Sequence, residues 1–255
     1  MKLSVIVTTY NWPQALHAVL QSLVSQSRLP DEVIIADDGS GPETRQLIES
    51  FEAPFPIVHA WHADDGFQAG AARNNALAKV SGDWIVMLDG DCVCPPRFLE
   101  RHLRLASPGY LVAGNRRLLT QSQTEQYLEL GQSAKEFVDQ AGAGKNRYLP
   151  LGPLRDIRAK QWSLVRTCNL GISTNDALHL QGFDEAYRGW GKEDSDFAVR
   201  AVNAGLKIRM GQLACTVLHL YHAEADRAQL PVNIARLEQV LASNDYLPRA
   251  SRLKD

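Results

Sequence analysis

Two carboxylates separated by one glycine, Asp89 and Asp91, follow directly after the apolar run Trp84–Leu88. Such a run is typical of a buried strand, and open α/β sheets bind ligands at the carboxyl ends of their strands. Carboxylate oxygens are hard donors that suit Mg²⁺ or Mn²⁺ bridging to phosphate, and Gly90 leaves room for a bound diphosphate. A surface turn is the alternative, because Asp-Gly is a common turn dipeptide.

Polar residues also end three other predicted strands. The runs Leu3–Val7, Glu32–Ala36 and Ile57–Ala60 alternate with segments of helical periodicity, and Asn11 with Pro13 predicts the first helix start. The four strand ends carry Thr8–Asn11, Asp37–Asp38, His62–Gly66 and Asp89–Asp91. This alternation predicts a parallel sheet, on whose carboxyl edge the four ends form a nucleotide-sized site.

A second acidic group, Glu193 to Asp196, opens a predicted helix that runs to about Asn203. Carboxylates in a first turn stabilise a helix through its dipole, which is the structural alternative to a catalytic role. The dipole does not explain Trp190, which lies between two glycines just before the acids. An aromatic face beside a carboxylate suits a sugar, whose C–H groups stack while its hydroxyls form hydrogen bonds.

Two histidines, His219 and His222, follow the predicted strand Ala214–Leu218. A lone histidine late in a chain is more often a packing or surface residue than a ligand. Two of them at a strand exit, in a chain that also offers a carboxylate site, leave both a packing role and a metal-ligand role open.

Length and charge limit the function classes. The 255 residues suit one large α/β domain, or one domain with a substantial appendage, and the net charge of -2 predicts no nucleic-acid partner. No apolar run reaches bilayer length, and Leu3–Val7 is too short for the core of a secretion signal, so we expect a cytoplasmic protein. No second closely spaced cysteine pair completes a zinc site with Cys92 and Cys94, which predicts buried free thiols. The sequence predicts no particular oligomeric state.

The segment 115–165 departs from the strand and helix rhythm. An amphipathic helix is predicted there from the apolar positions Tyr127, Leu130, Ala134, Phe137 and Val138. Basic residues then dominate: Lys145, Arg147, Arg155, Arg158, Lys160 and Arg166 against the single acid Asp156. Two interpretations stay open, a solvated basic face and a mobile segment that folds over diphosphate or meets an anionic acceptor.

Taken together, these motifs resemble those of family 2 glycosyltransferases of the GT-A fold. The matching pieces, in chain order, are Ser4–Asn11, Asp37–Ser40, Gly70–Asn74, Asp89–Asp91 and Gly189–Asp194. The last piece, with Arg200 and Gly205, is also similar to the carboxyl part of β-1,4-galactosyltransferases, polypeptide N-acetylgalactosaminyltransferases and chondroitin-polymerase modules. Asp-x-Asp alone is weakly specific, whereas the ordered set is strongly specific.

The resemblance implies an α/β fold of the GT-A type, with a mostly parallel central sheet flanked by helices. One GT-A domain would span residues 1–222, with a nucleotide-sugar-binding half at 1–114 and an acceptor and catalytic half at 166–222. The variable segment 115–165 between them would take part in acceptor choice. Residues 223–255 would add a C-terminal helix and a basic tail.

The resemblance also implies roles for single residues. The nucleotide would be held by Thr8, Tyr10, Asp37 or Asp38, Arg73 and Gly90, and Asp89 would contact the ribose or the metal shell. Mn²⁺ or Mg²⁺ would be bound by Asp91 and a later histidine, for which spacing favours His219 and leaves His222 open. Asp194 would be the general base and Glu193 its acceptor-orienting neighbour. The acceptor sugar would meet Trp190, Gly191 and Asn169.

These residue types suit a hexosyltransferase. A divalent cation stabilises charge on a diphosphate leaving group, and a carboxylate takes the proton of the attacking hydroxyl. One base and no evident nucleophile predict direct displacement with inversion. The expected substrates are a UDP-sugar carrying a hexose or N-acetylhexosamine and a glycan or lipid-linked glycan, in the synthesis of cell-surface polysaccharide or lipopolysaccharide. With a lipid-linked acceptor, the stretch from Arg155 to Arg166 would touch the inner face of the membrane.

Three rival functions share part of this pattern. A sugar nucleotidyltransferase would show a Gly-rich, basic phosphate loop where this chain has Thr8–Trp12. A dehydrogenase would show G-x-G-x-x-G after the first strand, which this sequence lacks. A non-catalytic carbohydrate- or nucleotide-binding partner of a glycan assembly system would keep the fold, but this chain retains both the metal carboxylate and the base.

Overall fold

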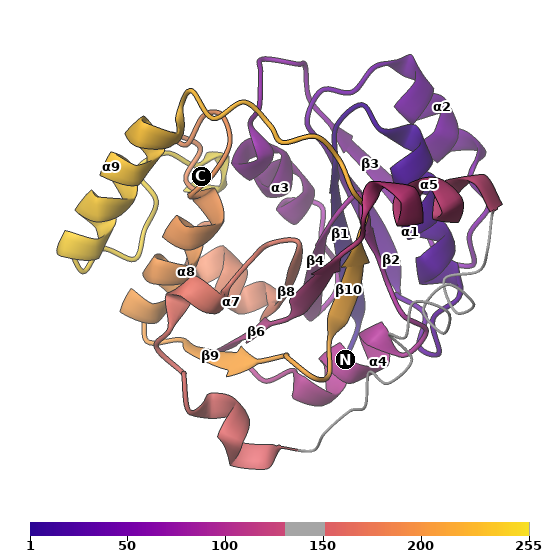
Figure 1. Cartoon of the computed structure of the whole chain (residues 1–255). Helices are drawn as coiled ribbons and strands as arrows, with labels where there is room; N and C mark the ends of the chain where they lie inside the picture. Colours follow the sequence, from indigo (N-terminus) through magenta and orange to yellow (C-terminus); the bar gives the residue numbers. More distant parts are fainter. Residues whose placement is uncertain (131–150, 255) are drawn as a thin grey trace.

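The computed structural model describes residues 1–130 and 151–254. A seven-stranded sheet in the order β3-β2-β1-β4-β8-β6-β9 lies at its centre (Figure 1). In chain order these strands are β1 (Leu3–Thr9), β2 (Glu32–Asp37), β3 (Ile57–Trp61), β4 (Trp84–Asp89), β6 (Tyr110–Ala113), β8 (Asn169–Ser173) and β9 (Lys207–Met210). Only β8 runs antiparallel to its neighbours, so the predicted mostly parallel α/β sheet is confirmed.

Helices cover both faces of this sheet. One face is packed by α1 (Pro13–Val24), α2 (Pro42–Ser50) and α4 (Phe98–Leu105). The other face is packed by α3 (Ala69–Leu77), α7 (Thr174–His179) and α8 (Glu193–Asn203). Val5 and Val7 of β1 therefore point to one helix layer and Ile6 to the other, which explains why the central strands are continuous apolar runs.

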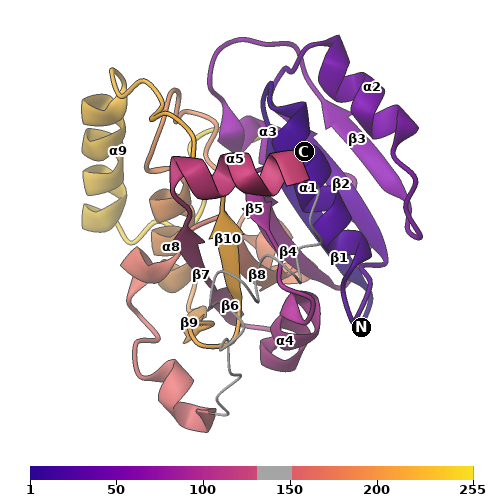
Figure 2. The same ribbon diagram turned by 45° about the vertical axis from the view of Figure 1, so that its right-hand side comes forward.

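A second, three-stranded sheet joins distant parts of the chain. Its order is β5 (Cys92–Val93), β10 (Thr216–His219) and β7 (Asn115–Leu118), with β10 antiparallel to β5 and parallel to β7. The helix α5 (Gln121–Leu130) packs beside α1 above it (Figure 2). The small sheet thus brings the end of β10 against the two residues that follow the Asp-Gly-Asp motif.

The C-terminal part packs onto the second helix layer. The helix α9 (Leu230–Ala242) contacts α8 through Leu237 and Val240, and the short 3-10 helix η4 (Arg252–Lys254) follows it. None of the described helices combines the length and the apolar composition that crossing a bilayer requires.

The segment 115–165 is described in part. α5 contains Tyr127 as predicted, whereas Ala134, Phe137 and Val138 lie outside the described residues, as do Lys145 and Arg147. Two 3-10 helices follow, η2 (Gly152–Asp156) and η3 (Trp162–Leu164).

The interpretation of the basic stretch as a solvated face is wrong for Arg155. This side chain is buried, and its guanidinium donates to the carbonyls of Met210 and Gln212 at 2.6 and 2.9 Å. The side chain therefore holds η2 against the end of β9. Arg158, Lys160 and Arg166 are exposed.

Candidate active site

The Asp-Gly-Asp motif lies where β4 ends beside β1. Gly90 donates its N–H to the Thr8 carbonyl at 2.7 Å, and a Cβ on Gly90 would lie 3.0 Å from that oxygen. The close approach to β1 thus explains the glycine without reference to a bound diphosphate, which was the reason predicted from the sequence. Asp89, the last residue of β4, and Asp91, which follows the strand, lie on either side of Gly90.

Asp91 faces two imidazoles. The Nε2 atoms of His219 and His222 lie 3.6 and 3.3 Å from Asp91 Oδ2. Each Nδ1 lies within hydrogen-bond distance of a backbone carbonyl, that of Leu220 at 2.9 Å or of Ala223 at 2.7 Å. A ring whose Nδ1–H donates to a carbonyl presents the Nε2 lone pair, which is the state that binds a metal. Both histidines therefore aim a ligand atom at the same carboxylate.

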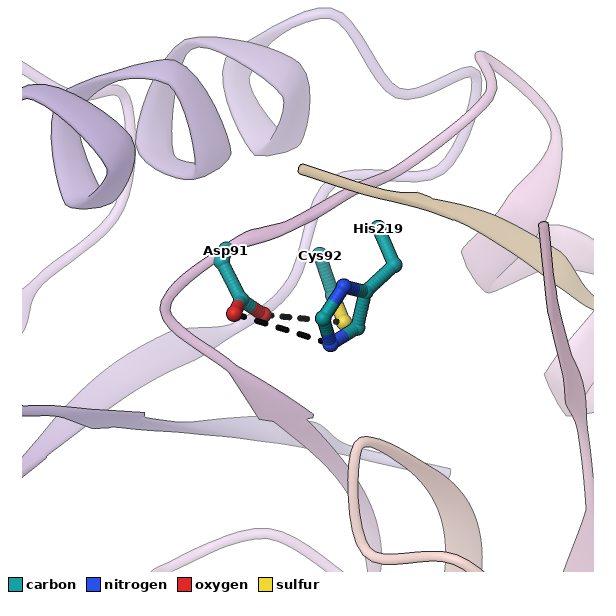
Figure 3. Close-up of side chains that lie close together, drawn as sticks. All are labelled: Asp91, Cys92 and His219. Atoms are coloured by element: carbon teal, nitrogen blue, oxygen red, sulfur yellow. Dashed lines mark hydrogen bonds and ion pairs between the residues drawn. The ribbon is translucent and has the colours of Figure 1, made fainter. Parts of the chain in front are cut away.

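Cys92 completes a cluster with Asp91 and His219, whose ligand atoms lie within 4.8 Å of one another (Figure 3). Burial raises the pKa of the Cys92 thiol well above its usual value, and a hydrogen bond with Cys168 adds to the effect. A cysteine thiolate is a soft donor, which suits zinc or copper more than a hard divalent cation. Carboxylate and imidazole donors from Asp91, His219 and His222 fit a divalent cation such as Mn²⁺ better.

Arg73 of α3 links the strand ends to the start of α8. The guanidinium is buried and donates to Thr8 Oγ1, Glu193 Oε1 and Asp89 Oδ1, each at 3.1 Å. Burial alone would lower the pKa of Arg73, but the carboxylates of Asp89 and Glu193 raise it above the usual value. The charged guanidinium thus joins the two halves of the site.

A tight turn aims the first residues of α8 at this cluster. Gly189, Gly191 and Lys192 have positive φ angles of 68°, 100° and 81°. Glu193 forms an ion pair with Arg73. Burial and the neighbouring Asp194 raise the pKa of Glu193, although the Arg73 guanidinium acts to lower it. Asp194 is half-buried, and its Oδ1 accepts a hydrogen bond from the Ser195 hydroxyl at 3.2 Å.

Trp190 projects from the same turn. Its side chain is 38% exposed, and the guanidinium of Arg227 lies 4.9 Å from the ring centroid. Asn233 of α9 holds the turn by donating to the carbonyls of Arg188 and Gly191 at 3.0 and 2.9 Å. The sequence analysis missed Arg227 and Asn233, because both belong to elements remote from the Trp-Gly motif in sequence.

Asp37 and Asp38 have different surroundings at the end of β2. Asp37 is bonded by His59 Nε2 at 2.7 Å and by the Ser40 N–H at 2.8 Å, so both oxygens are engaged. Asp38 Oδ2 accepts the Gln68 N–H at 2.8 Å. Asp38 Oδ1 is buried without a hydrogen-bond partner in the described part of the chain, although His62 Nε2 lies 3.1 Å away. Asp38 is therefore the carboxylate with a spare acceptor.

Two more predicted residues lie at different depths. Tyr10 is 49% exposed, and its hydroxyl donates to Asp64 at 3.0 Å. Asn169 is buried: its amide donates to the carbonyls of Asn115 and Cys215 at 2.7 and 3.1 Å, and its oxygen contacts His102 Nε2 at 2.9 Å. Asn169 thus ties the two sheets together, and its predicted acceptor contact stays a prediction.

Comparison with known families agrees with this architecture. Residues 4–153 match the model for Glycosyl transferase family 2, and residues 156–223 match the model for the N-terminal domain of galactosyltransferase. Because the first match covers more than half of the chain, the protein belongs to glycosyltransferase family 2. The predicted family and class of enzyme are confirmed.

Individual relatives extend the comparison. Hyaluronan synthase of Pasteurella multocida is 30% identical over 80% of this chain and 23% of its own length. Chondroitin synthase of Escherichia coli is 26% identical over 87% of this chain and 34% of its own length, so the chain spans about a third or less of both relatives. The crystal structure of S. aureus TarS 1-349 in complex with UDP has a TM-score of 0.65 at 17% identity, over 96% of this chain and 65% of that chain, and shows the same fold.

Proposed function

We propose that this protein is an inverting, metal-dependent glycosyltransferase that moves a hexose or N-acetylhexosamine from a UDP-sugar to a hydroxyl of a glycan. One observation carries the proposal: Asp91 faces two histidines at one strand end, while Arg73 ties the neighbouring Asp89 to the catalytic carboxylate pair at the start of α8. A metal site beside a proton acceptor is the combination that glycosyl transfer from a diphosphate requires.

UDP as the nucleotide has two supports. TarS, which shares the fold, was solved in complex with UDP. Asp38 Oδ1 is buried without a hydrogen-bond partner among the described residues, and uracil offers an N–H donor for such an oxygen. Thr8, Tyr10 and Arg73 would complete the nucleotide site from β1, the loop after it and α3.

The chain's own residues perform the transfer as follows. Asp91, His219 and His222 would hold Mn²⁺ or Mg²⁺, which supplies charge stabilisation to the diphosphate. Asp194 takes the proton of the acceptor hydroxyl while that oxygen forms its bond to the anomeric carbon and the bond to the diphosphate breaks. Glu193, fixed by Arg73, orients the acceptor, and Trp190 with Gly191 packs against its sugar ring. A single displacement inverts the anomeric configuration.

The acceptor is proposed from the relatives and the surface. Two relatives are named as synthases of chondroitin and hyaluronan, which supports a polysaccharide acceptor. Arg158, Lys160 and Arg166 are exposed and would allow contact with anionic lipid headgroups at the cytoplasmic face of a membrane, if the glycan is lipid-linked.

Replacing the proposed base separates transfer from binding. UDP with Mn²⁺ should raise the Tm of the wild type and of Asp194→Asn equally, because ligand binding stabilises the folded state in both. Transfer by Asp194→Asn should fall about 10²- to 10⁴-fold. Glu238→Gln removes an exposed carboxylate of α9 and should leave the Tm shift and the rate of transfer unchanged.

The rival functions give other results in this experiment. A Tm shift without turnover in any form would indicate a non-catalytic binding partner. Pyrophosphate release from UTP and a sugar phosphate would indicate a nucleotidyltransferase. No shift and no turnover would refute the proposed function.

A further inference from the structure

Arg116 of β7 lies on the face of the small sheet that carries the candidate metal ligands. In the register of this sheet, His219 of β10 pairs with Cys92 on one side and with Leu118 on the other. Paired residues point to the same face, and residues two apart on a strand share a face. Arg116 therefore projects on the same face as His219 and Cys92, and Arg117 projects on the opposite face.

The guanidinium of Arg116 has spare hydrogen-bond donors. Its Nη1 lies 3.9 Å from the Cys168 thiol, and this is its only hydrogen bond within residues 1–130 and 151–254. A thiol is a weak acceptor, whereas an arginine carries five N–H donors. Burial alone would lower the pKa of Arg116, but the electrostatic influence of its neighbours, which include the Asp89 carboxylate, raises it above its usual value.

Arg73, the other arginine of the site, already uses its side-chain nitrogens in hydrogen bonds within the protein. Its three nitrogens donate to Thr8, Glu193 and Asp89, and each bond would have to break before Arg73 could bind a phosphate. A diphosphate entering beside Asp89, Asp91 and Glu193 needs positive charge besides a divalent cation. Arg116 is the cation on this face that can supply it without losing an ion pair of the described chain.

We propose that Arg116 binds the diphosphate of the donor and stabilises the negative charge that it gains as the leaving group. The inference rests on the proposed function. A planar guanidinium forms paired hydrogen bonds with phosphate oxygens. Its weak bond to the Cys168 thiol does not compete with them. As the anomeric carbon leaves the β-phosphate oxygen, the electron pair stays on that oxygen and faces the guanidinium.

Calorimetric titration with UDP and with uridine, both in the presence of Mn²⁺, tests this contact. Arg116→Ala should weaken UDP binding about 10- to 100-fold, as loss of charge-assisted hydrogen bonds predicts, and should leave uridine binding unchanged. Arg116→Lys should restore part of the loss. Arg117→Ala removes the same charge from the opposite face and should bind UDP as the wild type does.

Three results would overturn the inference. Equal weakening of UDP and uridine would assign a general structural role to Arg116. If Arg116→Ala bound UDP as tightly as the wild type does but had a raised KM for the acceptor, Arg116 would bind the acceptor and not the diphosphate. Failure of the wild type to bind UDP would refute the proposed function itself, which the other two results leave standing.

Discussion

Asp37 and Asp38 are neighbours in sequence, yet their surroundings shift their pKa values in opposite directions. For Asp37, burial alone would raise the pKa, but hydrogen bonds from His59 and Ser40 outweigh it and lower the pKa below its usual value. For Asp38, burial dominates over the Gln68 N–H and raises the pKa to about 6. The first carboxylate stabilises the fold when ionised, and the second does so when protonated.

Asp38→Asn should stabilise the protein in a pH-dependent way. Because the folded pKa of Asp38 is about 6 and its ordinary value is 3.8, its contribution to stability is lost as pH rises from about 4 to 6. Asparagine has the same shape and does not ionise. Thermal unfolding should show that the advantage of Asp38→Asn over the wild type grows between pH 4.5 and pH 8, by up to about 3 kcal/mol.

Asp37→Asn is the matched control and should behave in the opposite way. It removes an ionised group whose pKa is lowered, so it should destabilise the protein at pH 8. A Tm difference between Asp38→Asn and the wild type that is the same at both pH values would contradict the assignment for Asp38.

Which carboxylate is available could not be predicted from sequence. The motif Asp37–Ser40 marks both as strand-end acids, and it does not show that His59 of β3 engages Asp37 or that Gln68 engages Asp38. His59 comes from β3, which pairs in parallel with β2, and Gln68 lies just before the first residue of α3. Tertiary contacts decide the chemistry of side chains whose types the sequence identifies.

At the scale of elements, strand pairing extends the strands beyond their apolar runs. β1 continues to Thr9, and β4 includes Asp89, because Thr8 is paired with Ala36 of β2 and with Asp89 of β4. Pairing on both sides satisfies backbone groups of polar residues that composition assigns to loops. The strands were predicted correctly in type and order, but the predicted ranges stopped before the polar residues at their carboxyl ends.

Helix starts were predicted with mixed success. The first helix begins at Pro13, and α8 begins at Glu193, as predicted. The prediction that Asn11 caps α1 was wrong. The φ of Asn11 is 46°, and its side chain accepts the Gly41 N–H at 2.8 Å. The small sheet was not predicted, because β5 has two residues, β7 is exposed and polar, and both pair with a strand that lies more than 100 residues later in the chain.

The helix α9 is hydrogen-bonded to the turn that carries Trp190. Asn233 is buried and donates to the carbonyls of Arg188 and Gly191. Asn233→Ala should loosen the turn and raise the KM for the acceptor about tenfold, while the affinity for UDP stays unchanged. Gln239→Ala, at an exposed position of the same helix, is the control. An unchanged acceptor KM, or an equal loss of UDP affinity, would contradict this role of α9.

At the scale of the whole molecule, Arg73 joins the two halves that the sequence analysis assigned to donor and acceptor. It belongs to α3, and its partners come from β1, β4 and α8. The arginine was predicted to hold the nucleotide, whereas the network linking Thr8, Asp89 and Glu193 through it became evident only from the packing of α3 against α8.

Arg73→Ala should destabilise the protein by about 3 to 5 kcal/mol, because it leaves the Glu193 side chain, which is only 12% exposed, without its cation. The loss should correspond to a fall in Tm of roughly 10 °C for a chain of this length. The deficit should shrink as pH falls, since burial and Asp194 raise the pKa of Glu193 and protonation removes the unpaired charge. Arg158→Ala should leave Tm unchanged, and equal Tm values for the two variants would refute the role of Arg73.

The central claim is that a metal held by Asp91 and two histidines activates a UDP-sugar, and donor hydrolysis without acceptor tests it most directly. A panel of UDP-sugars would be incubated with the wild type and with Asp91→Ala, with and without Mn²⁺, and free UDP measured. We expect slow release from one UDP-sugar, only with Mn²⁺ and only in the wild type. Release that depends on neither Mn²⁺ nor Asp91, or absence of release together with absence of UDP binding, would contradict the claim.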